Sequence, residues 1–206
     1  CLKDVPDVLG ESEIKSRLHT RWAGQTLYYY DEIDSTNTQI KRLAEEDAPH
    51  GTLAVADYQS KGKGRRGHAW DSPHGSAIYM SILFRPDIRP DRASMLTLVI
   101  GLSVAQAIRD NLGLQAQIKW PNDIVLNGKK LVGILTEMSA QMNYIEYLVT
   151  GIGINANLRE FPEELADKAT SLQKETGHKV NRSALIAECM KKIEENYETF
   201  VKTQDL

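Results

Sequence analysis

The chain has 206 residues, 41% of them hydrophobic and 26% charged, which is ordinary for a soluble globular protein. This length suits one large domain whose core needs no disulfide or metal staples. A formal net charge of −3 gives no overall attraction to nucleic acid or an anionic membrane, so local clusters of cations must hold any anionic ligand. The two cysteines, Cys1 and Cys189, form neither a disulfide framework nor a metal pattern, which indicates a reducing cytoplasm.

Hydrophobic periodicity and turn residues predict interspersed helices and strands. The first half predicts, in order, a short helix with Ser12 as its N-cap, a strand, an amphipathic helix and two strands, over residues 9–22, 26–33, 34–47, 51–58 and 76–86. The second half predicts a long helix ending near Gly113, a strand, a hairpin turning at Asn127–Gly128, a strand and a terminal helix, over residues 92–112, 116–120, 123–139, 144–156 and 181–202. Strands joined by hairpins, with helices between them, predict an α+β fold with a mixed or antiparallel sheet.

The longest apolar run covers residues 95–108 and is too short and too interrupted to span a bilayer. No secretory signal peptide is visible. Because the chain starts with Cys1 rather than methionine, we expect a fragment or a processed chain.

The segment "KGKGRRGHAW", residues 61–70, places four cations and three glycines in its first seven positions. Gly62, Gly64 and Gly67 have the G-x-G-x-x-G spacing of a dinucleotide site, but residues 68–76 contain a proline and a glycine where that site needs a helix. A P-loop also fails, because His68–Ala69 stands where Lys followed by Ser or Thr is required.

This basic loop could be no more than a solvated surface loop. Three features favour a ligand: it carries no acidic residue between Lys61 and Trp70, its glycines free many backbone N–H groups, and long unstructured loops are usually functional or disordered. We expect it to close over a phosphate-bearing substrate. Nucleic-acid binding, with Trp70 stacking on bases, is the weaker alternative because one short cluster in an acidic chain gives a small electrostatic footprint.

A second constellation lies in "KWPNDIVLNGKKLVGILTEM", residues 119–138. Strand alternation puts Lys129 and Lys130 on opposite faces, so one of them can point into a site, and Gly133 leaves room for a ligand. An edge-strand charge explains Lys129 better than Lys130. Asn122 and Asp123 also fit an ordinary turn.

Two shorter motifs have a structural and a functional interpretation. "DSTN" at 34–37 has the composition of a helix cap, which is its first interpretation on local grounds. "GIGIN" at 151–155 also fits a tight turn after a strand.

Together, "DSTN", "YQSKGKGRRGHAW", "KWPNDI…LNGKKL…GIL…E" and "GIGIN" resemble the biotin–protein ligases, the bacterial biotin–[acetyl-CoA-carboxylase] ligase family, in order and spacing. The match covers roughly residues 25–190. It implies a class II aminoacyl-tRNA synthetase-like catalytic domain of the biotin–lipoyl ligase kind. It also implies a cytoplasmic, AMP-forming ligase that activates biotin with ATP to biotinyl-5′-AMP and passes the acyl group to a lysine of a biotin carboxyl carrier protein.

The resemblance also implies residue roles. Lys130 and Arg65 are the expected catalytic cations. The biotin site is expected to comprise Ser35, Thr36, Asn37, Gln59, Gly62, Lys63, Gly64, Arg65, Lys130 and Gly133. The ATP site is expected to comprise Arg66, Trp70, Lys119, Asn122, Asp123, Lys130 and Asn155. Mg²⁺ is expected to arrive with ATP, because the sequence contains no dedicated metal cage.

The chain departs from the family pattern in several places. Lys63 stands where many relatives have arginine, so a bidentate fork is lost there, and His68–Ala69 replaces a more basic pair. We expect residues 1–24 to be a lead segment, a linker from a missing DNA-binding domain, and residues 25–206 to be the catalytic domain, without the SH3-like domain of many relatives. DNA binding would then belong to the parent protein.

The alternatives are a lipoate or octanoate ligase or transferase of the same fold, and a repressor core that senses biotinyl-adenylate without transferring it. No membrane partner is expected. A homodimer through the basic loop or the neighbouring sheet edge is left open.

Overall fold

The computed structural model of the protein describes residues 7–67, 70 and 73–203, except for the side chain of Arg66. Within these residues one seven-stranded sheet has the spatial order β1-β2-β3-β7-β6-β5-β4. Its strands are β1 Leu27–Ile33, β2 Leu53–Gln59, β3 Ile78–Phe84, β4 Gln117–Lys119, β5 Asp123–Leu126, β6 Lys129–Ala140 and β7 Ile145–Ile154. β1 and β2 run parallel and the other neighbouring pairs antiparallel, which confirms the predicted α+β fold with a mixed sheet.

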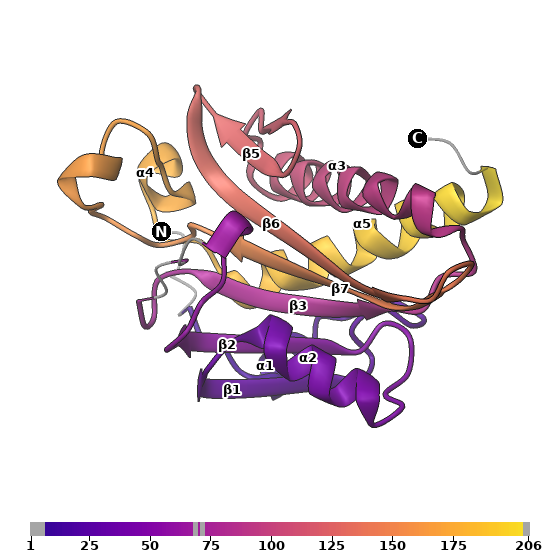
Figure 1. Ribbon diagram of the computed structural model, residues 1–206. Coiled ribbons are helices and arrows are strands. Elements are labelled where there is room, and N and C mark those ends of the chain that lie inside the picture. Colours follow the sequence, from indigo (N-terminus) through magenta and orange to yellow (C-terminus); the bar gives the residue numbers. More distant parts are fainter. Residues whose placement is uncertain (1–6, 68–69, 71–72, 204–206) are drawn as a thin grey trace.

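Helices cover the two faces of this sheet unequally. The long helices α3 (Ala93–Leu112) and α5 (Arg182–Thr203) pack on each other and enclose the main core on one face (Figure 1). The opposite face carries α2 (Thr36–Glu45), which forms a smaller core with the sheet through residues such as Ile40 and Leu43. Ten helical residues span only about 15 Å. The rest of that face is therefore left for the basic loop and a cavity.

The turn signals of the sequence match the structure well. Gly113 ends α3 in the left-handed region at φ 69°, and Asn127 and Gly128 adopt φ 51° and 78° at the hairpin turn, as predicted. The predicted cap at Ser12 is wrong. The first helix, α1, spans Glu11–Lys15 with Gly10 at the cap position, and the Ser12 carbonyl accepts a helical hydrogen bond instead.

Four short elements were not predicted. Single helical turns carry too few residues for a periodic pattern. They are the helix α4 (Leu172–Thr176) and the 3₁₀ turns η1 (Arg65–Gly67), η2 (Pro90–Arg92) and η3 (Glu163–Leu165).

The apolar character of α3 is explained by the core. With its lead-in turn it runs from Pro90 to Leu112, and by length and composition alone it could cross a membrane, contrary to the expectation from its apolar run. Half of its most apolar stretch is buried inside the protein, and Leu96, Ile100 and Ile108 are fully buried against the sheet and α5. The helix is therefore the central core helix of this domain.

Buried ion pairs of Arg182 link the N-terminal end of the described chain to α5. The Arg182 guanidinium, 5% exposed, donates to Asp7 Oδ2 at 2.7 Å and to Asp57 Oδ1 at 2.8 Å. Arg182 thus links the first described residue to the end of β2. Ile14 of α1 is fully buried in the main core. Residues 7–24 pack against the same core as the rest, and the expected domain boundary at residue 24 stays a prediction.

A second anchor of this front segment is Glu194 of α5. Its carboxylate accepts the backbone N–H groups of Arg21, Trp22 and Ala23 at 2.8–3.1 Å. Burial alone would raise the pKa of Glu194, but these three donors outweigh it and hold the pKa below its ordinary value. Because the donors are backbone groups, the contact fixes the path of the chain rather than one side chain.

Candidate functional site

A cavity of about 500 Å³ opens on the α2 face of the sheet, beside the start of that helix. Small-molecule sites typically enclose about 300–1,000 Å³. Its floor comes from β3, β6 and β7, and its walls come from the start of α2, the basic loop and the β4–β5 turn. The described lining residues are Ser35, Thr36, Asn37, Gln59, Lys63, Gly64, Arg65, Trp70, Tyr79, Met80, Pro121, Asn122, Asp123, Lys130, Gly133, Ile134, Leu135, Gly151, Ile152 and Gly153.

Glycines on neighbouring strands make the floor low enough to hold an aromatic ring. A row of cross-strand partners crosses the sheet through Lys119, Asp123, Gly133, Gly153 and Tyr79. A Cβ atom at Gly133 would lie 2.5 Å from the Trp70 indole, and one at Gly153 would lie 2.7 Å from it. The indole can approach the sheet this closely because both positions lack a side chain.

The next row of the floor carries a buried polar network. Gly151 stands opposite Ser81, and a Cβ there would collide with the Asn37 amide oxygen. The Ser81 hydroxyl lies 2.6 Å from Asn37 Oδ1 and 2.8 Å from Thr36 Oγ1, and the Thr36 backbone N–H donates to Gln59 Oε1 at 2.8 Å. These mutual bonds fix the polar side chains at one end of the cavity.

The cap interpretation of "DSTN" is wrong for the Ser35 side chain. Ser35 does occupy the N-cap position of α2, but its side chain makes no capping hydrogen bond. Ser35 is 2% exposed and lines the cavity together with Thr36 and Asn37. The helix start therefore presents this motif to the cavity.

Asn37 is held by Glu137 of β6, the glutamate that ends the motif "GIL…E" and for which the sequence analysis predicted no role. The Glu137 carboxylate accepts Asn37 Nδ2 at 2.8 Å and Lys41 Nζ at 2.6 Å. Burial alone would raise the pKa of Glu137, but the bonds from Lys41 and Asn37 outweigh it and lower the pKa. This bridge joins α2 to β6 beside the cavity and orients Asn37.

Lys130 enters the cavity from the start of β6. Its Nζ lies 2.8 Å from Asp123 Oδ1 and 5.3 Å from the centre of the Trp70 ring. Its neighbour Lys129 turns the other way and donates to the Ala166 carbonyl at 3.3 Å. The alternation predicted for the two lysines is thus confirmed, and the Lys130 side chain is 38% exposed, so it is free to approach a ligand.

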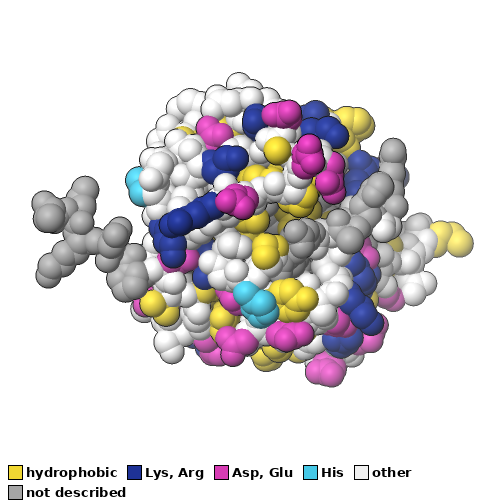
Figure 2. Space-filling model, turned by 90° about the vertical axis from the view of Figure 1, so that its left-hand side faces the viewer, with side chains coloured by type: hydrophobic (Ala, Val, Ile, Leu, Met, Phe, Trp, Pro, Cys, Tyr) yellow, Lys and Arg dark blue, Asp and Glu magenta, His cyan; other side chains and the backbone are white. Residues whose placement is uncertain are grey.

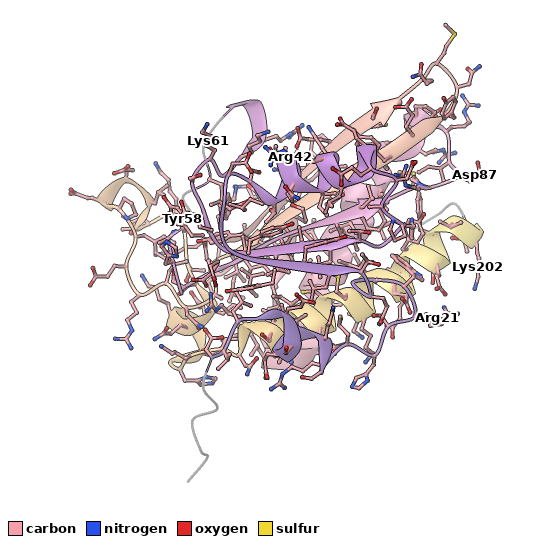
Figure 3. The ribbon with its side chains drawn as sticks, turned by 90° about the horizontal axis from the view of Figure 1, so that it is seen from below. Arg21, Arg42, Tyr58, Lys61, Asp87 and Lys202 are labelled. Carbon is pink, nitrogen blue, oxygen red and sulfur yellow. The ribbon has the colours of Figure 1, made fainter. Side chains whose placement is uncertain are left out.

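The basic loop forms the wall above the floor. Lys63, Gly64 and Arg65 line the cavity, and Arg65 Nη1 lies 3.4 Å from Asn122 Oδ1 in the β4–β5 turn. At its front the loop is anchored by the Lys61 N–H, which donates to the Asp34 carbonyl at 2.8 Å. Figure 3 places Lys61 near Arg42 of α2, away from Asp87.

The cavity carries more positive than negative side chains among the described lining residues. Three cations, Lys63, Arg65 and Lys130, line it, against one carboxylate, Asp123, among the described lining residues. The face seen in Figure 2 carries basic and acidic side chains side by side. The described residues contain no group of three or more His, Cys, Asp or Glu side chains that could hold a metal ion. The site is thus suited to an anionic ligand with some apolar surface.

The structure brings most of the expected site residues together. Those in the cavity lining are Ser35, Thr36, Asn37, Gln59, Lys63, Gly64, Arg65, Trp70, Asn122, Asp123, Lys130 and Gly133. Gly62 lies outside this lining, but its carbonyl accepts the Trp70 N–H at 3.0 Å and so shapes the loop. The Arg66 side chain lies outside the described residues.

Two expected ATP-site residues lie elsewhere. Lys119 stands in the floor row, but on the exposed edge strand β4 and outside the lining. Asn155 donates from its amide to the Thr170 carbonyl at 3.1 Å, and its backbone bonds to Leu131 and Leu172. Asn155 therefore holds the following loop against β6.

Sequence reasoning missed part of the floor. The tight-turn interpretation of "GIGIN" is wrong for Gly151 and Gly153, because both lie within β7, inside the strand predicted over residues 144–156. Two glycines at alternate positions of an apolar strand were the available signal, because alternate residues share one face and glycine there permits close approach. Ser81 gave no such signal, and Glu137 belonged to a motif of the resemblance without a predicted role, since each acts through a partner on another element.

Comparison with known proteins places the chain in a family. The profile of the biotin/lipoate A/B protein ligase family matches residues 29–155, more than half of the chain. The chain belongs to this family. The match to the biotin/lipoate ligases runs from within β1 to just past the end of β7 and so includes the whole floor of the cavity.

Individual relatives agree with this assignment. The chain is 43% identical over 198 residues to the bifunctional ligase/repressor BirA of Bacillus subtilis, covering 95% of this chain and 61% of that protein. It is 34% identical over 169 residues to BirA of Escherichia coli, covering 82% and 52%. A biotin protein ligase from Aquifex aeolicus, solved with biotin and ATP, superimposes with a TM-score of 0.75 at 38% identity, covering 87% of this chain and 73% of that one. The chain thus spans about three fifths or less of these two BirA proteins.

Proposed function

We propose that this chain activates biotin with ATP to biotinyl-5′-AMP and transfers the biotinyl group to a lysine of a biotin carboxyl carrier protein. The observation that carries the proposal is the Lys130 amine, which enters a glycine-floored cavity beneath the basic loop. The kinship with relatives named for biotin, such as the biotin–[acetyl-CoA-carboxylase] ligase of Paracoccus denitrificans, and with the Aquifex aeolicus enzyme solved with biotin and ATP, supports it.

The geometry suits this chemistry. A carboxylate and a triphosphate repel each other, and phosphoryl transfer is catalysed mainly by positioning and charge neutralisation. Lys130 is the proposed cation between the biotin carboxylate and the α-phosphate, and Arg65 is the proposed cation of the closing loop. The buried hydroxyls and amides at the start of α2, with Gln59, are the proposed head-group site for biotin.

The nucleotide is proposed to lie at the other end of the cavity, near Trp70, Asn122 and Asp123. The roles expected for Arg66, Lys119 and Asn155 stay predictions. Mg²⁺ is proposed to arrive with the phosphates of ATP, because the described residues form no metal cage. A reducing bacterial cytoplasm is the proposed compartment. Homodimer formation, and DNA binding by a longer parent protein, stay predictions.

The family name also covers lipoate ligases, so the acid substrate needs a direct test. The chain is incubated with ATP, Mg²⁺ and either biotin or octanoate, and pyrophosphate release is measured. We expect release that depends on biotin. Release with octanoate and none with biotin would reverse the assignment to a lipoate or octanoate enzyme.

A repressor core that holds the adenylate without transferring it is separated by the second half-reaction. Adding a carboxyl carrier domain should convert bound biotinyl-5′-AMP into a biotinylated lysine, detected by the mass of the carrier. Adenylate that forms but stays on the protein would favour the sensing function.

A further inference from the structure

Asp123 carries a charge opposite to that of the three cations in the described cavity lining. It is the one carboxylate among the described lining residues, and its negative charge would oppose both the carboxylate and the triphosphate of the proposed substrates. A carboxylate at such a position needs a function that a cation or an amide cannot supply.

Its position is fixed from both sides. Asp123 opens β5, where it pairs with Lys119 on β4 and with Gly133 on β6. Cross-strand partners share a face of the sheet, so the Asp123 side chain stands in the floor row beside the glycines. The Trp70 indole lies over Gly133, the next position in this row.

Cations surround this carboxylate. Lys130 of β6 is 2.8 Å away, Lys119 of β4 stands opposite in the row, and Lys63 and Arg65 of the basic loop line the same cavity. The pairing with Lys130 masks the negative charge while two anionic substrates enter. A shift of Lys130 towards the acyl phosphate would leave the Asp123 carboxylate without this partner.

The second half-reaction needs a proton acceptor. The acceptor lysine has an ordinary pKa near 10.4, so at neutral pH it is an ammonium ion with no lone pair for attack. A positioned general base typically contributes about 10²–10⁴-fold. The described lining residues include no histidine, and Asp123 is the one side chain among them that can both attract an ammonium ion and take its proton.

We propose that Asp123 is the catalytic base of the transfer step, an inference that rests on the proposed function. Asp123 takes one proton from the lysine ammonium, and the neutral nitrogen attacks the acyl carbon of biotinyl-5′-AMP. The bond from that carbon to the phosphate oxygen breaks, and its electron pair stays on AMP. The nitrogen loses its second proton to the leaving phosphate oxygen, which completes the amide. Asp123 then releases its proton to water.

The test starts from preformed biotinyl-5′-AMP bound to the full chain and compares two nucleophiles. One is the lysine of a carboxyl carrier domain. The other is hydroxylamine, which is largely unprotonated at neutral pH and needs no base before attack. Asp123→Asn should lower lysine transfer roughly 100-fold more than hydroxylamine capture. The difference should shrink as the pH approaches the pKa of lysine, about 10.4.

Two further variants make the outcome decisive. Asp123→Glu should restore part of the lysine transfer, and Asp91→Asn, which changes an exposed acid of η2 outside the cavity lining, should change neither reaction. Equal losses with both nucleophiles, at every pH, would mean that Asp123 acts only by positioning Lys130 and would overturn the proposal. Absence of any transfer by the unaltered chain would instead count against the proposed function.

Discussion

The two faces of the sheet are built from the same strands and differ in nearly every respect. On the face covered by α3 and α5, β7 presents Ile152 and Ile154, which are almost fully buried in the main core. On the other face the alternating residues are Gly151 and Gly153, which leave room for the side chains of Asn37 and Trp70 in the cavity lining. One strand therefore supplies stability and the site at once, because its side chains alternate between faces.

The charged groups differ in the same way. Arg182 forms ion pairs with both Asp7 and Asp57, and its side chain is only 5% exposed. The pair between Lys130 and Asp123 on the cavity side is 38% and 25% exposed. An ion pair that must exchange its partner for a ligand stays accessible, whereas one that holds the fold is buried and fully hydrogen-bonded.

The largest expected effect comes from breaking the buried pairs. Arg182→Met leaves two carboxylates without their partner, and such losses typically cost about 3–5 kcal/mol of unfolding free energy. Urea unfolding followed by fluorescence measures it. Arg89→Met removes an exposed pair and should cost about 1 kcal/mol or less. Equal effects of the two variants would contradict the distinction between structural and exposed pairs.

Adjacent residues of β7 should give opposite outcomes. Ile154→Ala removes buried core volume and should lower the unfolding free energy by about 2–5 kcal/mol while biotin still binds. Gly153→Val drives a side chain against Trp70, at the proposed nucleotide end, and should weaken ATP binding roughly tenfold or more, since overpacking costs about 1–3 kcal/mol. Calorimetric titration with biotin and with ATP, and thermal unfolding of both variants, check this. Unchanged ATP affinity in Gly153→Val would exclude the glycine floor from the nucleotide site.

The adjacent lysines of β6 sharpen the comparison at the cavity. Lys130→Met should slow biotin-dependent pyrophosphate release by about 10²–10³-fold, the usual cost of removing one preorganised charge-stabilising group. Lys129→Met is the matched control, because its side chain faces Ala166 and not the cavity. Initial rates at saturating ATP are the measurement, and a similar loss in both variants would assign Lys130 no special role.

The smallest expected effect is on how the unfolding free energy depends on pH. It involves His50, which lies beside the face covered by α3 and α5. Burial, with a smaller contribution from Arg85, lowers the pKa of His50 from 6.5 to about 4, and its Nδ1 accepts the Arg85 N–H at 3.0 Å. The folded state holds His50 neutral, so the unfolded state binds more protons between pH 4 and 6.5. Stability from this group is present above pH 6.5 and is lost as the pH falls through that window. In His50→Gln the unfolding free energy should depend less steeply on pH there, as urea titrations at several pH values would show.

Most elements of the fold could be predicted because their signals are local. The Asn127–Gly128 turn, the glycine that ends α3 and the periodicity of α5 each depend on a few adjacent residues. The misses were of two kinds. Short elements such as α4 and η3 contain too few residues to show a periodic pattern. The cap of α1 was predicted at the wrong residue, because Ser12 is only one of several residues near the helix start that could have capped it.

For the site, the sequence by itself determined the residue types: a cationic loop, a lysine on one face of a hairpin and a polar helix start. The tertiary structure decided which of them meet. Strand pairing brings Asp123 next to Lys130, and Gly153 next to Gly133 beneath Trp70. Helix packing on the sheet brings Asn37 into contact with Glu137 and Ser81, which are far away in the sequence. Local periodicity sets the face on which a side chain lies, but the register of distant strands sets its neighbours.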